Sequence, residues 1–217
     1  MSDREGENKP RRSKRVEEKN ATVDEEKKEE GETETLPPKL QRRQKMREEL
    51  KAKKEAAKLP IGSEIPNVTL PNQDGDDVNL NEVSKEHPVV VFVYPRANTS
   101  GCTRQAQSYV KKYEEFEKYG AKVYGLSIDA IKSNKKFQKK FGMQFDLLCD
   151  PEQKLLKPLG CKKGARGTSR SQFVFVDGKL VESTYEVKPD KSVGFSLQGI
   201  HQNIKNPKNS DDDDDSD

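Results

Sequence analysis

The fold is decided by residues 89–105, which read VVVFVYPRANTSGCTRQ. The first five residues are apolar and mostly β-branched, which predicts a fully buried strand at the centre of a sheet. Proline, threonine and glycine follow before an amphipathic pattern begins, so Cys102 is expected on the first turn of a helix. The first N–H groups of a helix lack intrahelical partners and carry partial positive charge, which favours a thiolate. The stretch therefore predicts a reactive cysteine at a strand-to-helix junction.

The segments around this stretch alternate between strand patterns and helix patterns. Further strands are expected at 68–70, 78–80, 123–126, 146–149, 173–176 and 180–181, and helices at 102–119, 130–142, 151–159 and 190–205. Asp177-Gly178, between the last two strands, is typical of a hairpin turn. This order predicts the α/β fold class, with a central mixed sheet flanked by helices.

Composition divides the chain into three parts. With 36% charged and 30% hydrophobic residues, the 217-residue chain is too polar for one uniformly packed domain. Residues 1–60 hold no aromatic residue and little apolar periodicity, so we expect a disordered, charged N-terminal arm. Residues 206–217 end in a run of aspartates and are expected to form a disordered acidic tail. One α/β domain is therefore predicted over residues 61–205.

The sequence also argues against several classes of protein. It has no run of 18 apolar residues and no apolar leader after Met1, so we expect a soluble, intracellular protein without membrane contact. The three cysteines fit no metal or disulfide spacing, and the two histidines, His87 and His201, lie far apart. We therefore predict no metal site and no structural disulfide framework.

A compact basic cluster, KPRRSKR, lies at residues 9–15. Such clusters are read by nuclear import receptors or attracted to phosphate groups, although they are also common in solvated tails. The residues that would carry nuclear targeting are Arg11, Arg12, Lys14 and Arg15. They predict a nuclear protein, with the cytoplasm as a second location.

A second basic stretch lies at residues 39–58. It carries nine Lys and Arg against three Glu, and its apolar face is thin. Its composition favours an isolated helix that frays at its ends. This helix could bind nucleic acid weakly, and a solvated linker is the equal alternative.

The spacing Pro95-x3-Thr99-x2-Cys102 resembles the active-site signature of the peroxiredoxins. The surrounding VYPRA and GCTRQA sequences are most similar to the PrxQ branch, also called bacterioferritin comigratory protein, and within it to fungal nuclear thiol peroxidases. Further matching segments follow in the family's order, so the resemblance covers about residues 61–205. It implies a thioredoxin-like fold and a thiol-dependent peroxidase that uses no metal, flavin or haem.

The resemblance also implies the reaction and the partners. Hydrogen peroxide or an organic hydroperoxide would oxidise Cys102 to a sulfenic acid, and thioredoxin or a similar thiol would reduce it again. Antioxidant defence in the nucleus would be the role. The rival hypothesis is a redox sensor associated with chromatin or nucleic acid, in which the basic segments do the binding.

Further residues are candidates for the site around Cys102. Thr99 could return its hydroxyl toward the sulfur, or serve only as the N-cap of the helix. Pro95 would stiffen the loop and shield the sulfur from water. The family places its active-site arginine at the position of Arg170, and Arg166 is a weaker rival. A fixed guanidinium there would favour the thiolate and donate to the peroxide.

The residues that would recycle Cys102 depart from the family. Many PrxQ proteins carry a resolving cysteine five residues after the nucleophile, and Gln107 occupies that position in this chain. Cys149 closes an apolar strand and is expected in the core. Cys161 is a candidate resolving thiol, because its loop is expected to be accessible and holds neighbouring lysines. A cycle with one cysteine, in which an external thiol attacks the sulfenic acid, is the preferred prediction, and an intermolecular disulfide is the main alternative.

Overall fold

The computed structural model describes residues 37–164 and 167–205. The chain divides into two units, residues 1–42 and 43–217. The described part of the first unit holds the start of helix α1, Pro38–Ala56, and the second unit holds the sheet and the remaining elements. Within the described ranges, no helix has the length and apolar character needed to cross a membrane.

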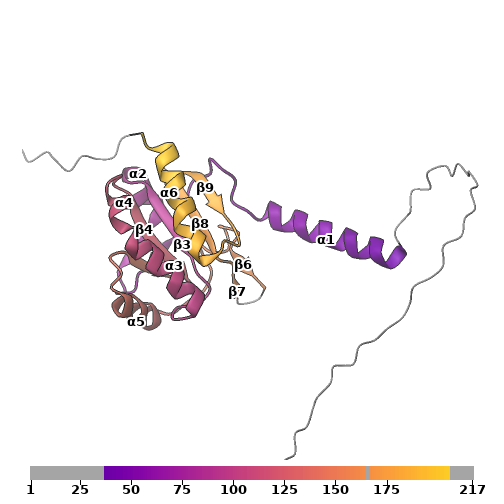
Figure 1. Cartoon of the computed structure of the whole chain (residues 1–217), viewed down its shortest axis with the longest axis horizontal. Coiled ribbons are helices and arrows are strands. Elements are labelled where there is room, and N and C mark those ends of the chain that lie inside the picture. The colour runs from indigo at the N-terminus through magenta and orange to yellow at the C-terminus, as the bar shows by residue number, and fades with distance from the viewer. Residues whose placement is uncertain (1–36, 165–166, 206–217) are drawn as a thin grey trace, which may run out of the picture. The chain divides into compact units, whose positions relative to one another are not determined.

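A five-stranded sheet forms the centre of the second unit (Figure 1). Its strands are β3 (Val89–Val93), β4 (Lys122–Ser127), β5 (Asp146–Cys149), β8 (Ser171–Val176) and β9 (Lys179–Thr184), in the spatial order β5-β4-β3-β8-β9. The pairs β3–β4 and β4–β5 are parallel, whereas β3–β8 and β8–β9 are antiparallel. All five residues of β3 are buried, as expected for a central strand. The predicted α/β class with a mixed sheet is confirmed.

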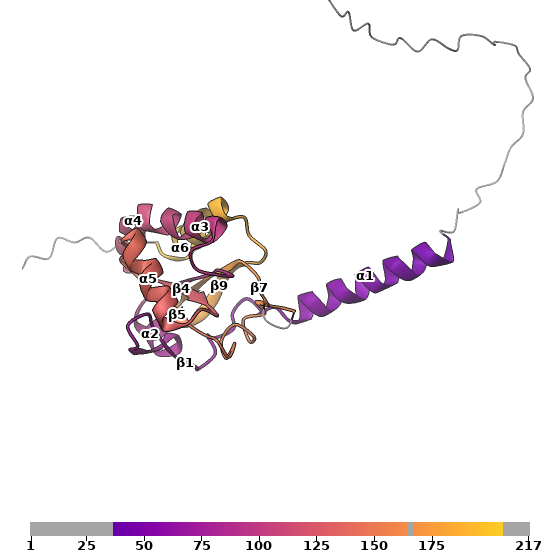
Figure 2. The ribbon, with the colours of Figure 1, turned by 90° about the horizontal axis from the view of Figure 1, so that it is seen from below.

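Apolar side chains cover both faces of the sheet. On one face, Phe92 packs in a cluster with Tyr109 of α3 (Ser100–Lys111), Phe137 of α5 (Ile131–Phe141) and Ile200 of α6 (Ser192–Asn203). On the other face, Leu80 of α2 (Leu80–Glu86) joins a second cluster. Figure 2 shows α3 and α6 on one side of the sheet and α2 on the other.

The remaining elements are short. They are β1 (Thr69–Pro71), β2 (Asp77–Asn79), α4 (Tyr113–Glu117), β6 (Lys162–Lys163), β7 (Gly167–Thr168) and the 3-10 helix η1 (Pro189–Lys191). The antiparallel pair β1–β2 and the hairpin β8–β9 confirm the two predicted strand pairs. The helices expected over 130–142 and 190–205 are present as α5 and α6.

Two predicted helices differ from the structure. The helix expected from Cys102 to Tyr119 is two helices, α3 and α4, because Lys112 leaves the helical region at φ −113° and ψ 10°. The helix expected over 151–159 is absent, and a series of turns takes its place. The carboxylate of buried Asp150 accepts three backbone N–H bonds there, and Gln153 adopts a left-handed φ of 58°, so no helix propagates.

Helix α2 was not predicted, because Leu80 was read as the end of a strand. The side chain of Asn79 accepts a hydrogen bond from Asn81 N at 3.0 Å and caps the helix. Glu82 lies three residues after this cap, which is a typical signal for a helix start. Because of this N-cap, the chain turns into a helix at Leu80, directly after β2.

The helix expected over residues 39–58 is present as α1, and it has no buried residue. Residues 38–56 are therefore helical, as the composition of residues 39–58 predicts. Contact with the sheet domain begins before residue 61, since Leu59 N donates to Tyr185 Oη at 2.9 Å. The predictions for residues 1–36 and 206–217 lie outside the described residues.

Candidate active site

Cys102 is the third residue of helix α3. The helix begins at Ser100, and Thr99 holds the N-cap position with extended backbone angles of φ −83° and ψ 151°. The predicted placement on the first helical turn is confirmed. The thiol is free and only 1% exposed, so the positive end of the helix acts on a sulfur that is shielded from water.

Arg170 lies against this sulfur, as the sequence predicted. Its Nη2 donates to Cys102 Sγ at 3.4 Å, although the two residues are 68 positions apart. Arg170 immediately precedes β8, which pairs directly with β3 and so brings the guanidinium to the end of the strand that leads to Cys102. A cation at this distance stabilises a thiolate, and its remaining N–H groups can donate to an oxygen that approaches the sulfur.

Gln105 was missed by the sequence analysis. Its Oε1 accepts a short hydrogen bond from Arg170 Nη1, and the side chain is fully buried. The signal that could have identified it is spacing, because residues three apart on a helix share a face. The guanidinium is therefore held by two residues of the same helix, Cys102 and Gln105.

Gly101 leaves room for this arrangement. A Cβ atom at this position would lie 3.2 Å from Arg170 Nη2 and 3.6 Å from Pro189 Cγ. A side chain there would press on the guanidinium. The absence of one allows Arg170 to approach the first turn of α3.

Thr99 does not make the contact that was expected. Its hydroxyl is exposed and donates to Arg96 O at 3.0 Å, and no side-chain hydrogen bond caps the helix. In the described part of the chain, the Thr99 hydroxyl makes no hydrogen bond with Cys102 Sγ. Thr99 thus holds the N-cap position and stabilises the preceding loop, while its carbonyl accepts from Thr103 N at 2.8 Å.

The loop that carries Pro95 is held by Asp129, which lies just after β4. Pro95 is half-buried directly after the buried Tyr94, at the point where β3 has ended. Asp129 Oδ2 accepts from Ala97 N at 2.7 Å and from Ser127 Oγ at 3.1 Å. Asp129 was also missed by the sequence analysis, because a single carboxylate after a strand carries no specific signal.

Cys161 is not accessible, which corrects the prediction. It is fully buried, and its Sγ lies 3.7 Å from Leu159 O. Burial raises the pKa of the Cys161 thiol to about 12, in spite of a hydrogen bond with Ser171 that acts in the opposite direction. The neighbouring Lys162 and Lys163 are exposed and do not offset this effect. The structure therefore gives no geometric support for Cys161 as the resolving thiol.

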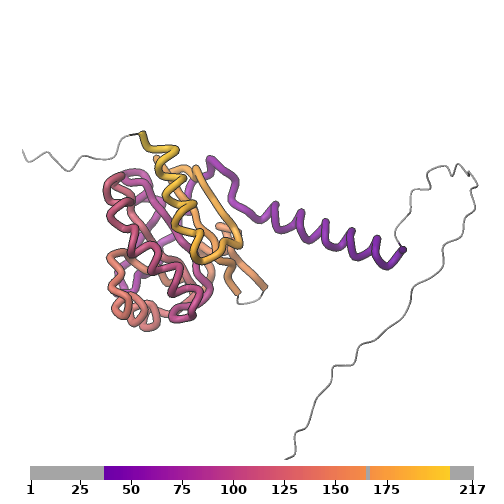
Figure 3. Tube along the Cα trace, in the orientation of Figure 1, coloured from indigo at the N-terminus to yellow at the C-terminus, as the bar shows by residue number. Residues whose placement is uncertain are grey.

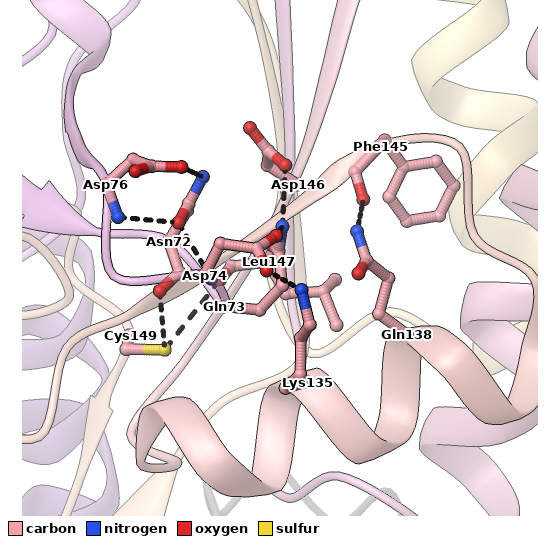
Figure 4. A network of polar contacts seen from close by, with 10 residues as sticks. All are labelled: Asn72, Gln73, Asp74, Asp76, Lys135, Gln138, Phe145, Asp146, Leu147 and Cys149. Atoms are coloured by element: carbon pink, nitrogen blue, oxygen red, sulfur yellow. Dashed lines mark hydrogen bonds and ion pairs between the residues drawn. The ribbon is translucent and has the colours of Figure 1, made fainter.

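Cys149 lies in the core, as predicted. Asn134 Nδ2 donates to its Sγ at 3.2 Å, and burial raises the pKa of this thiol. Figure 4 shows the polar cluster around it, in which the β1–β2 turn is joined to β5 through Asn72 and Gln73. Gln107, at the position of the usual resolving cysteine, is exposed on α3.

No group of three or more His, Cys, Asp or Glu side chains that could hold a metal ion occurs in the described part of the chain. Arg166 and the basic cluster at residues 9–15 lie outside it. The structure thus brings Cys102 and Arg170 together at the end of β3, the strand that leads into the loop with Pro95.

The sheet domain is similar in sequence to a known protein family and to individual known proteins. The profile of the AhpC/TSA family matches residues 61–183. A chloroplastic peroxiredoxin Q of rice (Oryza sativa subsp. japonica) is 39% identical over 145 residues, which is 65% of this chain and 66% of that protein. Peroxiredoxin bcp1 of Schizosaccharomyces pombe is 34% identical over 138 residues, or 62% of this chain and 71% of that protein.

Solved structures agree with these relatives. The peroxidoxin BcpB of Mycobacterium tuberculosis superposes with a TM-score of 0.63 and 27% identity, over 66% of this chain and 97% of that one. The peroxiredoxin Q of Xanthomonas campestris gives a TM-score of 0.62 and 27% identity, over 69% and 99%. The predicted thioredoxin-like fold and the resemblance to the PrxQ branch are confirmed.

Proposed function

We infer that this chain, which belongs to the AhpC/TSA family, is a thiol-dependent peroxidase like its peroxiredoxin relatives. The proposed substrates are hydrogen peroxide and organic hydroperoxides. One observation carries the proposal: a guanidinium 3.4 Å from a cysteine sulfur on the first turn of a helix. Two sources of positive potential thus act on one buried thiol.

The proposed reaction is a displacement at oxygen. The Cys102 thiolate attacks one peroxide oxygen, a sulfur–oxygen bond forms, and the oxygen–oxygen bond breaks. The products are a sulfenic acid on Cys102 and an alkoxide or hydroxide, which takes up a proton from water. Negative charge moves from sulfur to the departing oxygen, and Arg170 can donate to both.

Replacement of the nucleophile tests this function. The Cys102→Ser variant is expected to consume no peroxide with dithiothreitol as reductant, because a serine hydroxyl cannot be oxidised in this way. Cys161→Ala serves as the control, since Cys161 is fully buried in the opposite core cluster, and it should retain turnover. Turnover by Cys102→Ser would reject the assignment.

For recycling, we propose a cycle with one cysteine. An external thiol attacks the sulfenic acid, water leaves, and a second thiol releases the mixed disulfide. Three observations support it: Gln107 stands at the usual resolving position, and both Cys149 and Cys161 are buried. Thioredoxin is the proposed physiological reductant. Since Cys102 is itself 1% exposed, the first turn of α3 must open before a protein thiol can reach it.

Mass spectrometry distinguishes the one-cysteine cycle from resolution within one chain and from resolution between two chains. After oxidation with one equivalent of peroxide, the protein should carry one added oxygen on Cys102. If dimedone is present, Cys102 should carry the dimedone adduct of the sulfenic acid instead. An intramolecular Cys102–Cys161 disulfide would overturn the one-cysteine cycle. A disulfide between two chains would support intermolecular resolution instead.

We further propose that the protein acts in the nucleus. The support is the basic cluster at residues 9–15, which an import receptor would bind. Replacement of Arg11, Arg12, Lys14 and Arg15 by alanine should move a fluorescently tagged full-length chain out of the nucleus. Nuclear accumulation of that variant would exclude this cluster as the targeting signal.

A second candidate function, the nucleic-acid-associated sensor, is favoured by one feature of the structure. Helix α1 has eight Lys and Arg against three Glu, a net charge of +5, and none of its side chains is buried. Phosphate neutralisation by such a helix gives binding that weakens steeply with salt. This proposal concerns α1 alone and does not depend on Cys102.

Fluorescence anisotropy with labelled duplex DNA and the full chain tests the second function. Replacement of Arg43, Arg47 and Lys51 by glutamate should weaken binding at least tenfold and reduce the salt dependence, because each contact releases counterions. The matched control replaces Lys132, Lys136 and Lys139 on α5 in the same way. No binding by the unaltered chain, or equal losses in both variants, would remove the proposal.

A further inference from the structure

A continuous line of polar side chains runs from Arg170 into helix α6. Gln105 Nε2 donates to Ser192 Oγ at 2.9 Å, and Ser192 Oγ lies 2.9 Å from Tyr109 Oη. Tyr109 Oη in turn lies 2.8 Å from Ser196 Oγ. Gln105, Tyr109, Ser192 and Ser196 are all fully buried, so water competes for none of these bonds.

The line continues across the sheet to a carboxylate. Ser196 Oγ donates to Gln172 Oε1 at 3.0 Å, and Gln172 Nε2 donates to Thr184 Oγ1 at 3.1 Å. Thr184 Oγ1 then donates to Glu182 Oε1 at 3.2 Å. The Arg170 guanidinium beside Cys102 and the Glu182 carboxylate on β9 are thus joined by six side chains of α3, α6, β8 and β9.

The two end groups, Arg170 and Glu182, determine which atom donates and which accepts in every hydrogen bond of this line. Arginine can only donate, so Gln105 must turn its oxygen to Arg170 and its NH₂ group to Ser192. An ionised carboxylate can only accept, so the Thr184 hydroxyl must donate to Glu182 and accept from Gln172. Each amide therefore has one orientation.

The hydroxyl groups between the two amides follow from the same rule. The Ser196 hydroxyl donates to Gln172 Oε1 at 3.0 Å, with Ser192 O as a second acceptor at 3.3 Å, so its oxygen accepts from Tyr109, and Tyr109 accepts from Ser192. Burial raises the pKa of Tyr109, which keeps this phenol protonated as the line requires. All seven hydrogen bonds then point from Arg170 toward Glu182, an arrangement in which each bond polarises the next.

We propose that Ser192 and Tyr109 are positioning residues for the peroxidase reaction, which hold Gln105 in the orientation that keeps Arg170 on the Cys102 sulfur. The inference rests on the proposed function, since Arg170 is the group that it positions. Helix α6, which lies beside α3 in the trace of Figure 3, would then control the reactivity of Cys102 through hydrogen bonds and not only through packing.

Removal of either hydroxyl leaves two buried side chains without one of their hydrogen-bond partners. In Ser192→Ala the Gln105 NH₂ group loses its acceptor, and the amide can rotate and present that group to Arg170, which it would repel. In Tyr109→Phe both Ser192 and Ser196 lose a partner. Each change should slow the oxidation of Cys102 by hydrogen peroxide by about three- to tenfold.

A double-mutant cycle separates positioning from a general structural effect. Stopped-flow rates of Cys102 oxidation are measured for Ser192→Ala and Tyr109→Phe, each with Arg170 present and in the Arg170→Gln background. If the hydroxyl groups act through Arg170, the variants slow the reaction only when Arg170 is present. The pH profile of Cys102 alkylation by iodoacetamide should also move in the direction that Arg170→Gln moves it.

Ser84→Ala is the matched control. Ser84 is equally buried and its Oγ donates to Asn81 O at 2.8 Å, but it lies on α2 in the opposite layer. It should leave the oxidation rate within about twofold and the alkylation profile in place, even if it lowers stability. Circular dichroism checks that each variant is folded. If Ser192→Ala unfolds, the same oxidation rates are measured for Thr184→Val, which breaks the line of hydrogen bonds farther from Arg170.

The outcomes are distinct for the two proposals. Oxidation at the unaltered rate in folded Ser192→Ala and Tyr109→Phe would overturn the positioning role, and so would equal slowing in the Arg170→Gln background. Failure of the proposed function shows itself elsewhere, as an unaltered chain that does not consume peroxide or a Cys102→Ser variant that does.

Discussion

At Cys102, the helix backbone and a guanidinium act on the same sulfur atom. The sulfur sits on the first turn of α3, and Arg170 donates to it at 3.4 Å. Because the sulfur is only 1% exposed, both interactions operate with little screening by water. Gln105 holds the other side of the guanidinium, so the arginine is fixed before any substrate arrives.

The glycine beside the nucleophile gives a prediction at this scale. Gly101→Ala places a methyl group 3.2 Å from Arg170 Nη2 and should displace the guanidinium from the sulfur. The rate of Cys102 oxidation should fall about tenfold or more, while the unfolding free energy changes by less than about 1 kcal/mol. Stopped-flow oxidation and urea denaturation give the two values. A Gly101→Ala variant that reacts as fast as the unaltered chain would show that this close approach is not needed.

The buried thiol of Cys161 predicts a pH dependence of stability. Its pKa rises from 9.0 to about 12 on folding, so the folded state favours the protonated form. The contribution to stability is complete below pH 9.0 and is lost as the pH rises toward about 12, because the unfolded chain then loses its proton first.

Thermal unfolding between pH 8 and pH 10 tests this point. The melting temperature of the unaltered chain should fall more steeply with pH than that of Cys161→Ala, which lacks the titrating group. Burial also raises the pKa of Tyr185 in both proteins, and the Cys161 thiol adds to this rise only in the unaltered chain, so both effects act in the same direction. Parallel curves would contradict the buried, protonated state of Cys161.

Among the elements, the turns after β5 depend on one carboxylate. Asp150 is 1% exposed and accepts from Lys154 N, Leu155 N and Leu156 N at 2.7 to 2.9 Å. Asp150→Ala should lower the unfolding free energy by about 3 kcal/mol, and Asp150→Asn by less, since an amide oxygen can still accept. Urea denaturation measures both, with the exposed Asp190→Ala as the control. Equal stability of Asp150→Ala and Asp190→Ala would contradict this role.

The elements also show which features a sequence can predict. The strand 89–93, the cysteine on a first helical turn and Arg170 followed from periodicity, turn residues and the family resemblance, and the structure places them as expected. Gln105 and Asp129 could not be found in this way, because their roles come from contacts across 65 and 32 residues. The helix at 151–159 was wrong because a side chain, Asp150, competes with the helical hydrogen bonds.

Burial was predicted less well than the elements. Cys161 was expected to be accessible because its sequence neighbours are glycine and lysine, which are typical of a surface loop. In the structure its side chain turns into a core cluster with Leu156 and Leu159, while the lysines turn outward. The direction of one side chain in an irregular segment has no periodic signal, and it decides whether a thiol can serve in the cycle.

For the whole molecule, stability resides in the sheet domain and not in α1. Leu156 is fully buried beneath the sheet, whereas Leu50 on α1 is 58% exposed. Leu156→Ala should therefore cost about 2–5 kcal/mol of unfolding free energy, and Leu50→Ala no more than about 0.5 kcal/mol. Chemical denaturation of the two full-length variants provides a matched pair. A comparable loss in Leu50→Ala would mean that α1 packs against another surface in solution.

At the same scale, we expect different parts of the chain to determine peroxide reduction and to determine location or nucleic-acid binding. Residues 61–183 carry the family match and include Cys102 and Arg170, whereas residues 9–15 are a basic cluster in the sequence and helix α1 is basic with no buried residue. Changes in the basic segments should therefore alter location or nucleic-acid binding and leave peroxide reduction unchanged. The two sets of properties can be measured separately on the same full-length chain.

The rate of Cys102 oxidation by hydrogen peroxide, measured by stopped flow under pseudo-first-order conditions, tests the central claim most directly. The unaltered chain should react orders of magnitude faster than free cysteine, and Arg170→Gln should lose about 10²- to 10³-fold of that rate. Arg104 is an exposed arginine on the same helix as Cys102, and Arg104→Gln should lose little of the oxidation rate. A Cys102 that reacts no faster than a free thiol, or an Arg170→Gln variant that reacts like the unaltered chain, would contradict the account.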